Sequence, residues 1–428
     1  MSSKEWEEVE IQNICIVKRG ASPRPIHDYI SDKGIPWVKI ADATYSNSRF
    51  ISKTKEFIKK EGKEKSKYIQ KGTLILSNSA TPGIPKIMKI DACVHDGWLV
   101  IDNFKCVLKE FMYYMFIYER DKLVRLSTGS VFNNLKTDIV KRYKVNLPKL
   151  NNQKVIVKIL SILDDKIELN NQINKNLEEM AQVIFKHWFI DFEFPNENGE
   201  PYKSSGGEMV DSEMGLIPKG WRFEKLGNLL SEIVTGNRPK GGVSKFKKGI
   251  PSIGAESING LCNYDFSKTK YIPESYFSNM KKGIVKNGDI LLYKDGAKIG
   301  RKSMFLENFP FKRCCVNSHV FILRSNSLMK QNYLYFYLDQ KFMTKNIINL
   351  NTNSAQPGIN STSVKTLRIL LPSDKTLNLF NELVFPILRI IFNNSKGNQC
   401  LSNLRDALLP KLMSGEIRVP INDKEGNE

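Results

Sequence analysis

The stretch LNNQINKNLEEMAQVIFKHWF, residues 169–189, decides how this chain is organised. Together with the residues before it, it predicts a long helix, because a seam in steps of three and four runs through about five heptads. The seam consists of Ile156, Leu160, Leu163, Ile167, Asn170, Asn174, Leu177, Ala181, Ile184 and Trp188. Asn170 and Asn174 stand in its middle, where such a seam is normally apolar. These two polar residues need a structural reason.

An internal duplication supplies a candidate reason. The matching segments are residues 33–40 with 248–255, 71–77 with 287–293, and 127–148 with 352–372, and the start at Trp6 matches Trp221. Pro148 and Pro372 end two of these segments, and the same displacement of 224 residues can be kept beyond them. It maps the seam onto Phe380, Val384, Ile387, Ile391, Asn394, Asn398, Leu401, Arg405, Leu408 and Leu412. Both seam asparagines therefore match asparagines in the second copy.

Two copies of one helix, each about 40 residues and so about 60 Å long, can pack antiparallel around a local two-fold axis. We expect Asn170 and Asn174 to lie near Asn394 and Asn398, where hydrogen-bonded amides would set the register of the helix pair. The alternative is that these asparagines lie in a frayed, solvated stretch. Pro386 and Gly397 predict a kink in the second helix.

The predicted fold class is α+β, with two pseudo-symmetric α/β modules separated by two long antiparallel helices that form a coiled-coil-like spacer. The expected organisation begins with an N-terminal module (1–148) and a central long helix (149–194). A polar linker (195–220), a C-terminal module (221–372), and a distal helix with a tail (373–428) follow.

The formal net charge of +20 indicates a partner that is a polyanion, although a Lys- and Asn-rich genome would also produce part of it. No apolar run approaches the roughly 20 residues of a membrane span, and the polar N-terminus is unlike a secretory signal. Seven scattered cysteines without C-x-x-C spacing favour a reduced, cytoplasmic protein.

Sequence motifs for catalysis are missing. The chain has no glycine-rich phosphate loop and no H-E-x-x-H, and its four histidines share no metal-ligand spacing. We therefore expect a binding protein with no catalytic residues and no metal site.

Each module repeats three loop regions rich in side chains that read DNA, with glycines and prolines that let the backbone approach closely. The candidates in the N-terminal module are Arg24, Ser77, Asn78, Ser79, Lys86, Ser130, Asn133 and Asn134. Those in the C-terminal module are Asn237, Arg238, Lys240, Lys294, Asp295, Lys298, Arg301, Ser354, Gln356 and Asn360. The alternative is that these are ordinary polar surface loops.

An aromatic cluster stands where the first helix leaves its seam. Its members are Trp188, Phe189, Phe192 and Phe194. So much aromatic surface predicts either a docking patch for a partner or part of the protein's own core, and the sequence leaves both open.

Together these residues resemble the specificity subunit of type I restriction-modification systems. The family's pattern of a proline followed shortly by a glutamine is met by Pro148 and Gln153. FKHWFIDFEFP (185–195) looks like the family's domain junction, and LRDALLPKLMSGEIRV (404–419) looks like its C-terminal region. The resemblance covers essentially the whole chain, but Leu377 stands where the second copy would carry the glutamine.

The resemblance implies a non-catalytic subunit whose two target-recognition domains each read one half of a bipartite target in double-stranded DNA. Its helices would dock two methyltransferase subunits, and restriction/translocase subunits would join the complex. Those partners would carry the S-adenosylmethionine, ATP and Mg chemistry, with no cofactor in this chain. The alternatives are a specificity-type subunit of another methyltransferase or restriction assembly, an enzyme with fused recognition domains, and a non-specific basic scaffold.

Overall fold

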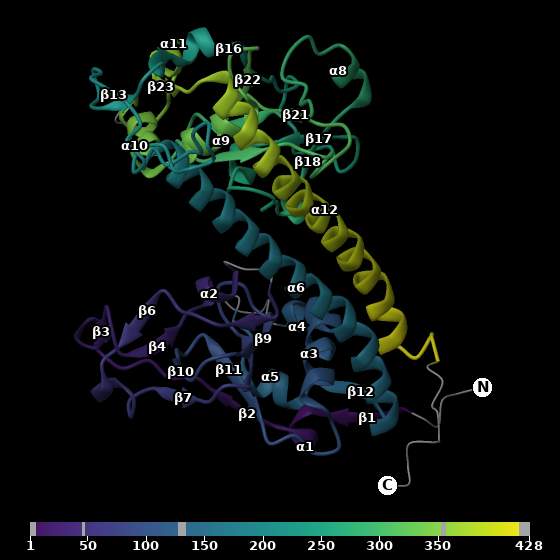
Figure 1. The fold of residues 1–428 in the computed structure, drawn as a ribbon. Helices are drawn as coiled ribbons and strands as arrows, with labels where there is room; N and C mark the ends of the chain where they lie inside the picture. The colour runs from purple at the N-terminus through teal and green to yellow at the C-terminus, as the bar shows by residue number, and fades with distance from the viewer. Residues whose placement is uncertain (1–5, 45–47, 127–133, 352–356, 419–428) are drawn as a thin grey trace. The chain divides into compact units, whose positions relative to one another are not determined.

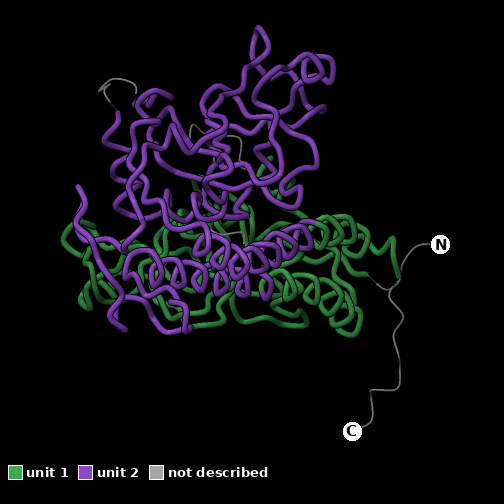
Figure 2. Tube along the Cα trace, turned by 45° about the horizontal axis from the view of Figure 1, so that its top comes forward, with its two compact units in different colours: residues 1–168, 400–428 green, residues 169–399 purple. Residues whose placement is uncertain are grey.

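A computed structural model describes residues 6–44, 48–126, 134–351 and 357–418 of the chain. The chain divides into two compact units (Figure 2). Unit 1 comprises residues 1–168 and 400–428, and unit 2 comprises residues 169–399. Each unit contains both sheets and helices, so the predicted α+β class is confirmed. The division of the chain into five segments, which was made from the sequence, stays a prediction.

The two long helices are α6 (Leu150–Phe189) and α12 (Asp374–Met413), close to the predicted ranges (Figure 1). Every residue of both predicted seams is buried or half-buried. α12 stays one helix through Pro386 and Gly397, so neither residue interrupts it. Both helices pass from one unit into the other, and each unit therefore contains a section of each helix.

Unit 1 carries a strand pair and two five-stranded sheets. The pair is β1 (Trp6–Glu10) with β12 (Lys144–Pro148). The first sheet has the order β3 (Ile30–Ser31), β6 (Glu56–Ile58), β4 (Ile35–Val38), β10 (Ala92–Val94) and β7 (Lys67–Ile69). The second has the order β2 (Ile16–Arg19), β11 (Trp98–Asp102), β8 (Leu74–Ser77), β9 (Pro85–Met88) and β5 (Phe50–Ile51).

Unit 2 repeats this plan with fewer strands. Its strand pairs are β15 (Arg222–Lys225) with β23 (Arg368–Leu371) and β13 (Met209–Val210) with β14 (Ile217–Pro218). One sheet has the order β18 (Lys270–Ile272), β17 (Ile250–Ile253) and β21 (Cys315–Val316). The other has the order β16 (Leu230–Thr235), β22 (Val320–Ser325), β19 (Ile290–Tyr293) and β20 (Lys302–Met304).

Most of the shorter helices are duplicated too. Unit 1 has α1 (Ile11–Ile14), α2 (Ile40–Thr44), α3 (Lys109–Tyr118), α4 (Arg120–Leu126) and α5 (Thr137–Arg142). Unit 2 has α7 (Leu226–Leu229), α8 (Glu274–Ser278), α9 (Gln331–Asp339), α10 (Lys341–Asn349) and α11 (Ser361–Lys365). Short 3-10 turns cover Ile26–Asp28, Lys60–Gly62, Ala255–Ser257 and Phe266–Lys268. α3 and α9 each bring three large, fully buried aromatic side chains into the cores, Phe111, Tyr114 and Phe116 from α3 and Tyr333, Tyr335 and Phe336 from α9.

The repeated KGIP motif shows why the two copies share their backbone. Gly34 and Gly249 precede β4 and β17 with φ of 137° and 135°, a region that favours glycine. A Cβ at either position would overlap a carbonyl oxygen of the neighbouring strand, that of Ile58 in unit 1 and that of Ile272 in unit 2. The same glycine therefore permits the same strand pairing in both copies.

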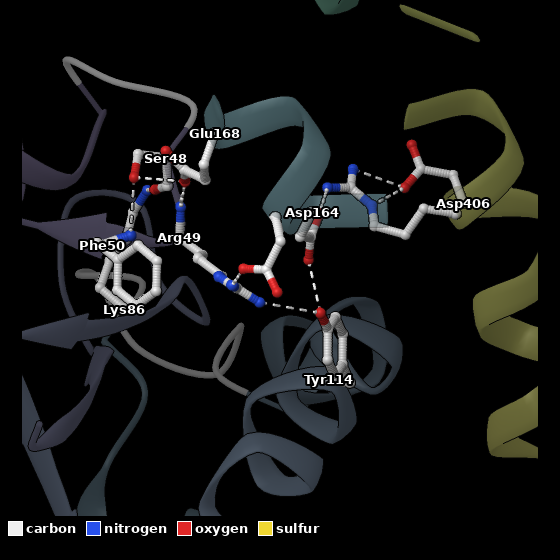
Figure 3. A network of polar contacts seen from close by, with 10 residues as sticks. Ser48, Arg49, Phe50, Lys86, Tyr114, Asp164, Glu168 and Asp406 are labelled. Atoms are coloured by element: carbon white, nitrogen blue, oxygen red, sulfur yellow. Dashed lines mark hydrogen bonds and ion pairs between the residues drawn. The ribbon is translucent and has the colours of Figure 1, made fainter. Parts of the chain in front are cut away.

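In unit 1 the module is joined to the helix pair by a buried polar network (Figure 3). The hydroxyl of Tyr114 on α3 donates to Asp164 Oδ2 of α6 at 2.7 Å, and Arg405 Nη1 of α12 donates to Asp164 Oδ1 at 2.7 Å. The backbone N–H of Arg49 donates to Glu168 Oε1 of α6 at 3.0 Å, and Ser48 Oγ donates to the same oxygen at 2.6 Å. Burial opposes the charge of Arg405, but the carboxylates of Asp164 and Asp406 outweigh it and raise its pKa.

In unit 2 the corresponding junction is mostly apolar. Phe185 of α6 packs on Phe336 of α9 with ring centroids 6.1 Å apart, and on Phe380 of α12 at 5.9 Å. Ala181 and Leu388 are fully buried in the same core. The two copies therefore attach their modules to the long helices with different chemistry.

Candidate nucleic-acid interface

In unit 1, two of the predicted loops meet at Asp96, in the turn after β10. Ser22 Oγ donates to Asp96 Oδ1 at 2.7 Å, and Asn78 Nδ2 donates to the Asp96 carbonyl oxygen at 3.2 Å. The Arg24 guanidinium lies 3.8 Å from Asp96 Oδ2, with its side chain 83% exposed. The hydrogen bond from Ser22, ahead of the opposing effect of burial, lowers the pKa of Asp96, and His95 and Arg19 act in the same direction. Asp96 is therefore the anionic centre of this loop cluster.

The remaining loop joins through backbone hydrogen bonds that are the same in both units. In unit 1 Asn78 N donates to Gly97 O at 2.8 Å, and Leu135 N donates to Asn78 O at 2.8 Å. In unit 2 Lys294 stands in the place of Asn78. Its N–H donates to His319 O at 3.1 Å, and its carbonyl accepts from Ile359 N at 3.0 Å. The described parts of the predicted loops thus converge by one shared set of contacts.

Asp295 is the anionic centre of the cluster in unit 2. Its Oδ2 accepts from Lys294 Nζ and lies 3.1 Å from His319 Nδ1. Gly296 N donates to Pro357 O at 2.8 Å, which holds the last loop against the middle one. Lys294 and Asp295 are half-buried, so this pair supports the loops as well as facing solvent.

Most of the predicted contact residues are accessible. The exposed ones are Arg24, Asn134, Asn237, Arg238, Lys240, Lys298, Arg301 and Asn360, and Ser79 is half-buried. Arg301 Nη1 donates to Asn259 Oδ1 at 2.9 Å, while Asn360 Oδ1 accepts from Ser363 N at 2.7 Å and so caps α11. Ser130, Asn133, Ser354 and Gln356 lie outside the described residues.

Three predicted contact residues are instead buried. Lys86 is 6% exposed, and its Nζ donates to the carbonyl oxygen of Ser48; burial lowers its pKa to about 8. Ser77 is fully buried, where its hydroxyl donates to Thr81 O at 2.6 Å and accepts from Ile84 N at 2.8 Å. Asn78 is 5% exposed. These side chains shape the loop from within and are not presented to a nucleic acid.

Two residues that the sequence did not single out stand beside the unit 1 cluster, Lys39 after β4 and His95 after β10. They line an open hollow of about 720 Å³ whose walls come from the loop after β2, from β4 and from the turn after β10. The residues around it are Ser22, Pro23, Arg24, Pro25, Ile26, Ile30, Trp37, Lys39 and His95. Only the parallel pairing of β4 with β10 brings Lys39 and His95 together, and a linear sequence does not display that pairing.

The aromatic cluster at the end of α6 does not form an exposed patch. Trp188, Phe189 and Phe194 are 8%, 1% and 7% exposed. Phe189 packs on Tyr333 at 4.7 Å between ring centroids, and Phe194 stacks on Trp221 at 4.7 Å. The sequence left open whether these residues form a docking patch or part of the core. They belong to the core, because their rings pack between α6, α9 and the residue before β15. Phe192 is half-buried against the same core.

The four seam asparagines lie together in unit 2. Asn170 Nδ2 donates to Asn398 Oδ1 at 2.8 Å, and Asn394 Nδ2 donates to Asn174 Oδ1 at 2.9 Å. Residue numbers rise on α6 as they fall on α12, so these two helix sections run antiparallel. The four asparagines do not lie in a frayed, solvated stretch, which was the alternative. They are buried or half-buried inside continuous helices.

No described helix is long and apolar enough to cross a lipid bilayer. Nor do the described histidine, cysteine, aspartate and glutamate side chains gather in threes that could hold a metal ion.

Comparison with known proteins identifies the family. The sequence model of the type I restriction modification DNA specificity domain matches twice, at residues 3–179 and 218–395. The MjaIX specificity subunit of a type I restriction enzyme from Methanocaldococcus jannaschii is 30% identical, over 97% of this chain and 94% of the relative. The HindI specificity subunit from Haemophilus influenzae is 24% identical, over 96% of this chain and all of the relative.

A solved structure shares the fold. The S subunit of a type I restriction-modification system from M. genitalium superposes with a TM-score of 0.54 at 13% identity, covering 95% of this chain and 96% of that one. The two matches of the family model coincide with the two copies in the sequence. The chain therefore belongs to the specificity subunits of type I restriction-modification systems, and its duplicated modules are target-recognition domains.

Proposed function

We propose that this chain is the DNA-reading subunit of a type I restriction-modification complex and that each recognition domain reads one half of a bipartite target. The observation that carries the proposal is the pair of loop clusters, which share one pattern of backbone hydrogen bonds and differ in their side chains. A shared frame with different side chains at its surface suits two readers of the same kind for different base sequences. The net charge of +20 suits the phosphate backbone of DNA.

We further propose that the chain itself is non-catalytic and acts in the cytoplasm, where its DNA target lies. Methyltransferase and restriction/translocase subunits would supply the chemistry that uses S-adenosylmethionine, ATP and Mg. The described loop clusters offer donors, amides and paired carboxylates, which are groups that recognise DNA.

The aromatic cluster is buried and cannot serve as a docking patch. We propose that methyltransferase subunits dock instead on the outer faces of the long helices. In unit 2, Leu169 and Val183 of α6 and Ile190, directly after its end, are 53%, 66% and 38% exposed and stand at multiples of seven residues. Leu383 and Ile390 of α12 are 50% and 48% exposed and also stand seven residues apart. Residues spaced by seven share one helix face, so each helix presents exposed apolar side chains on one outward face, interrupted on α6 by Asn176, and such a face suits a partner helix.

Charged substitutions on this face test the docking proposal. Val183→Glu combined with Leu383→Glu should leave the fold intact, since both side chains are exposed, and should abolish co-purification with the methyltransferase subunit. Lys175→Glu is the matched control on α6, because this exposed residue lies about 80° around the helix from Val183 and pairs with Glu179. Undiminished co-purification of the double variant would remove this face from the interface.

We also propose that α6 and α12 set the gap between the half-sites. Four residues inserted into each helix, after Gln172 and after Lys396, would add about 6 Å of helix. The preferred gap should then grow by one or two base pairs while the half-sites stay the same. Four residues inserted after Glu197, in the exposed linker, are the control. An unchanged gap in a helix variant that still folds and methylates would contradict this role.

The direct test of the function is the methylated motif. The chain, co-expressed with its methyltransferase subunit in a host that lacks other modification, should yield one motif made of two short half-sites around a fixed unspecified gap. Omitting the chain should abolish methylation of that motif. A continuous motif, or methylation without sequence preference, would contradict bipartite reading.

A further inference from the structure

The hollow of unit 1 lies at a strand edge where two side chains are brought together by register. β4 and β10 run parallel, with Trp37 beside Cys93 and Val38 beside Val94. The next residue on each strand is Lys39 or His95, so both follow the carboxyl ends of neighbouring parallel strands. In sheets with parallel strands, that edge is where ligands commonly bind.

Unit 2 has the same edge with different side chains. β17 and β21 are parallel, with Ser252 beside Cys315 and Ile253 beside Val316. The next residues are Gly254 and Asn317, in the places of Lys39 and His95. One frame therefore presents a lysine and a histidine in the first domain and a glycine and an asparagine in the second.

The frame that holds the variable residue is the same in detail. Gly97 N donates to His95 Nδ1 at 2.7 Å, and His319 N donates to Asn317 Oδ1 at 2.8 Å, so each side chain is fixed by the N–H two residues later. Gly20 in unit 1 approaches the carbonyl of His95 too closely to allow a Cβ. Gly236 of unit 2 approaches the carbonyl of Val316, one residue before Asn317, just as closely. Both units therefore hold this position by similar backbone contacts, but the side chain at the position differs between them.

The contact with Gly97 also determines what His95 offers to the hollow. Because Nδ1 accepts a backbone N–H, the neutral ring carries its proton on Nε2, which is then a donor. Burial lowers the pKa of His95, with Lys39 acting in the same direction and Asp96 and Asp42 opposing it, so the ring is neutral near pH 7. Among the described residues, Nε2 has no hydrogen-bond partner, and the ring lines the hollow.

The cationic groups of the hollow are donors as well. The Lys39 ammonium is held by Glu56, with Nζ donating to Oε1 at 2.7 Å, and its side chain is 39% exposed. The Arg24 guanidinium lies 3.8 Å from Asp96 and is largely exposed. Lysine, arginine and a neutral Nε2–H ring can only donate through these atoms. In the major groove guanine presents two acceptors, O6 and N7, to such donors.

We propose that this hollow reads a guanine in the half-site of the N-terminal domain, with His95 Nε2, Lys39 and Arg24 as the donors, and that Gly254 and Asn317 remove this preference from the other domain. The proposal rests on the proposed function and adds the base class that one domain selects. His95 and Lys39 are thereby assigned as specificity-determining residues.

The test exchanges the side chains of one domain for those of the other. His95→Asn keeps an acceptor for the Gly97 N–H, as Asn317 does for His319, and Lys39→Gly introduces the second residue of unit 2. The full chain, in complex with its methyltransferase subunit, is used to select bound duplexes from a library randomised in both half-sites. Lys105→Gly, at an exposed position after β11 that does not line the hollow, is the matched control.

The wild type and the control should select a G·C pair at one or more positions of the N-terminal half-site. Each variant should lower the preference for guanine at one such position on the order of tenfold, with the other half-site unchanged. Three results would overturn the proposal: a half-site without G·C, unchanged selection by both variants, or equal weakening for all sequences, which would mean phosphate contact. A wild type that selects no sequence at all would instead refute the proposed function.

Discussion

Unit 1 joins its recognition domain to the long helices through Tyr114 and Arg405, which both donate to Asp164, whereas unit 2 has apolar side chains at the three matching positions. The matching residues of unit 2 are Phe336, Leu388 and Ala181, at the same steps of α9, α12 and α6, and all are fully buried. Two copies of one backbone plan thus use a charged pair with a phenol in one case and close apolar packing in the other.

The two junctions are expected to lose stability through different kinds of substitution. A buried ion pair offsets its desolvation only while every partner is present, so removing one partner strands the other charge. Apolar packing loses stability roughly in proportion to the atoms removed and leaves no charge behind. Unit 1 is therefore expected to respond sharply to single polar substitutions, and unit 2 to side-chain volume.

The largest expected effect comes from removing Arg405. The Asp164 side chain is 6% exposed, and Arg405→Met leaves its carboxylate with Tyr114 as the remaining hydrogen-bond donor that the structure describes. We expect a loss of about 3–5 kcal/mol in the stability of unit 1. Hydrogen exchange in increasing urea, resolved on peptides of α3 and of the first half of α6, measures it.

Arg389→Met on α12 is the matched control for that variant. Arg389 pairs with Glu307 in unit 2, but its side chain is 54% exposed, so the loss should stay below about 1 kcal/mol. Equal losses in the two variants would contradict the importance of burial at Asp164.

A smaller net effect is expected when unit 1 receives the residues of unit 2. The triple variant Tyr114→Phe, Asp164→Leu, Arg405→Ala removes the buried carboxylate together with both of its donors, while Arg49, which donates to Tyr114 at 3.5 Å, keeps its ion pair with Asp165. Such replacements are often neutral or stabilising, and we expect the stability of unit 1 to stay within about 1 kcal/mol of the wild type or to rise. A triple variant as unstable as Arg405→Met would show that the network cannot be replaced by packing.

A further expected effect separates the units by pH. Burial, followed by the charges of Asp339 and Glu179, raises the pKa of Glu178 in unit 2 to about 7. The folded state then keeps a proton that the unfolded chain releases between about pH 4.5 and 7, so stability contributed by this group is full below that window and is lost as pH rises through it. In unit 1 the matching position on α12 is Ser402, whose side chain does not titrate.

Urea midpoints of unit 2 at pH 5 and pH 7.5 test this assignment. The wild type should be more stable at pH 5, and Glu178→Gln should reduce the difference, leaving the part that comes from the raised pKa of Asp339 and Asp289. An identical pH dependence in Glu178→Gln and wild type would show that Glu178 is not the responsible group.

Periodicity accounts for the part of the fold that the sequence predicted. The seams and the meeting of Asn170 with Asn398 follow from heptad phase and the duplication, both of which are local patterns. Burial of Lys86 was not predicted, because its short segment GIPK reads as a turn and only the sheet shows that it lies on β9. His95 and Lys39 were missed because they lie on separate strands that are parallel neighbours. Pairing between distant strands is a tertiary property that no window of the sequence contains.

Exchange of one domain tests whether each unit reads its own half of the target. Residues 221–372 are replaced by the corresponding segment of the M. jannaschii relative, with both long helices kept, and the methylated motif is sequenced. We predict that one half-site changes while the other half-site and the gap stay as in the wild type. A motif in which both half-sites change, or neither does, would contradict independent reading by the two units.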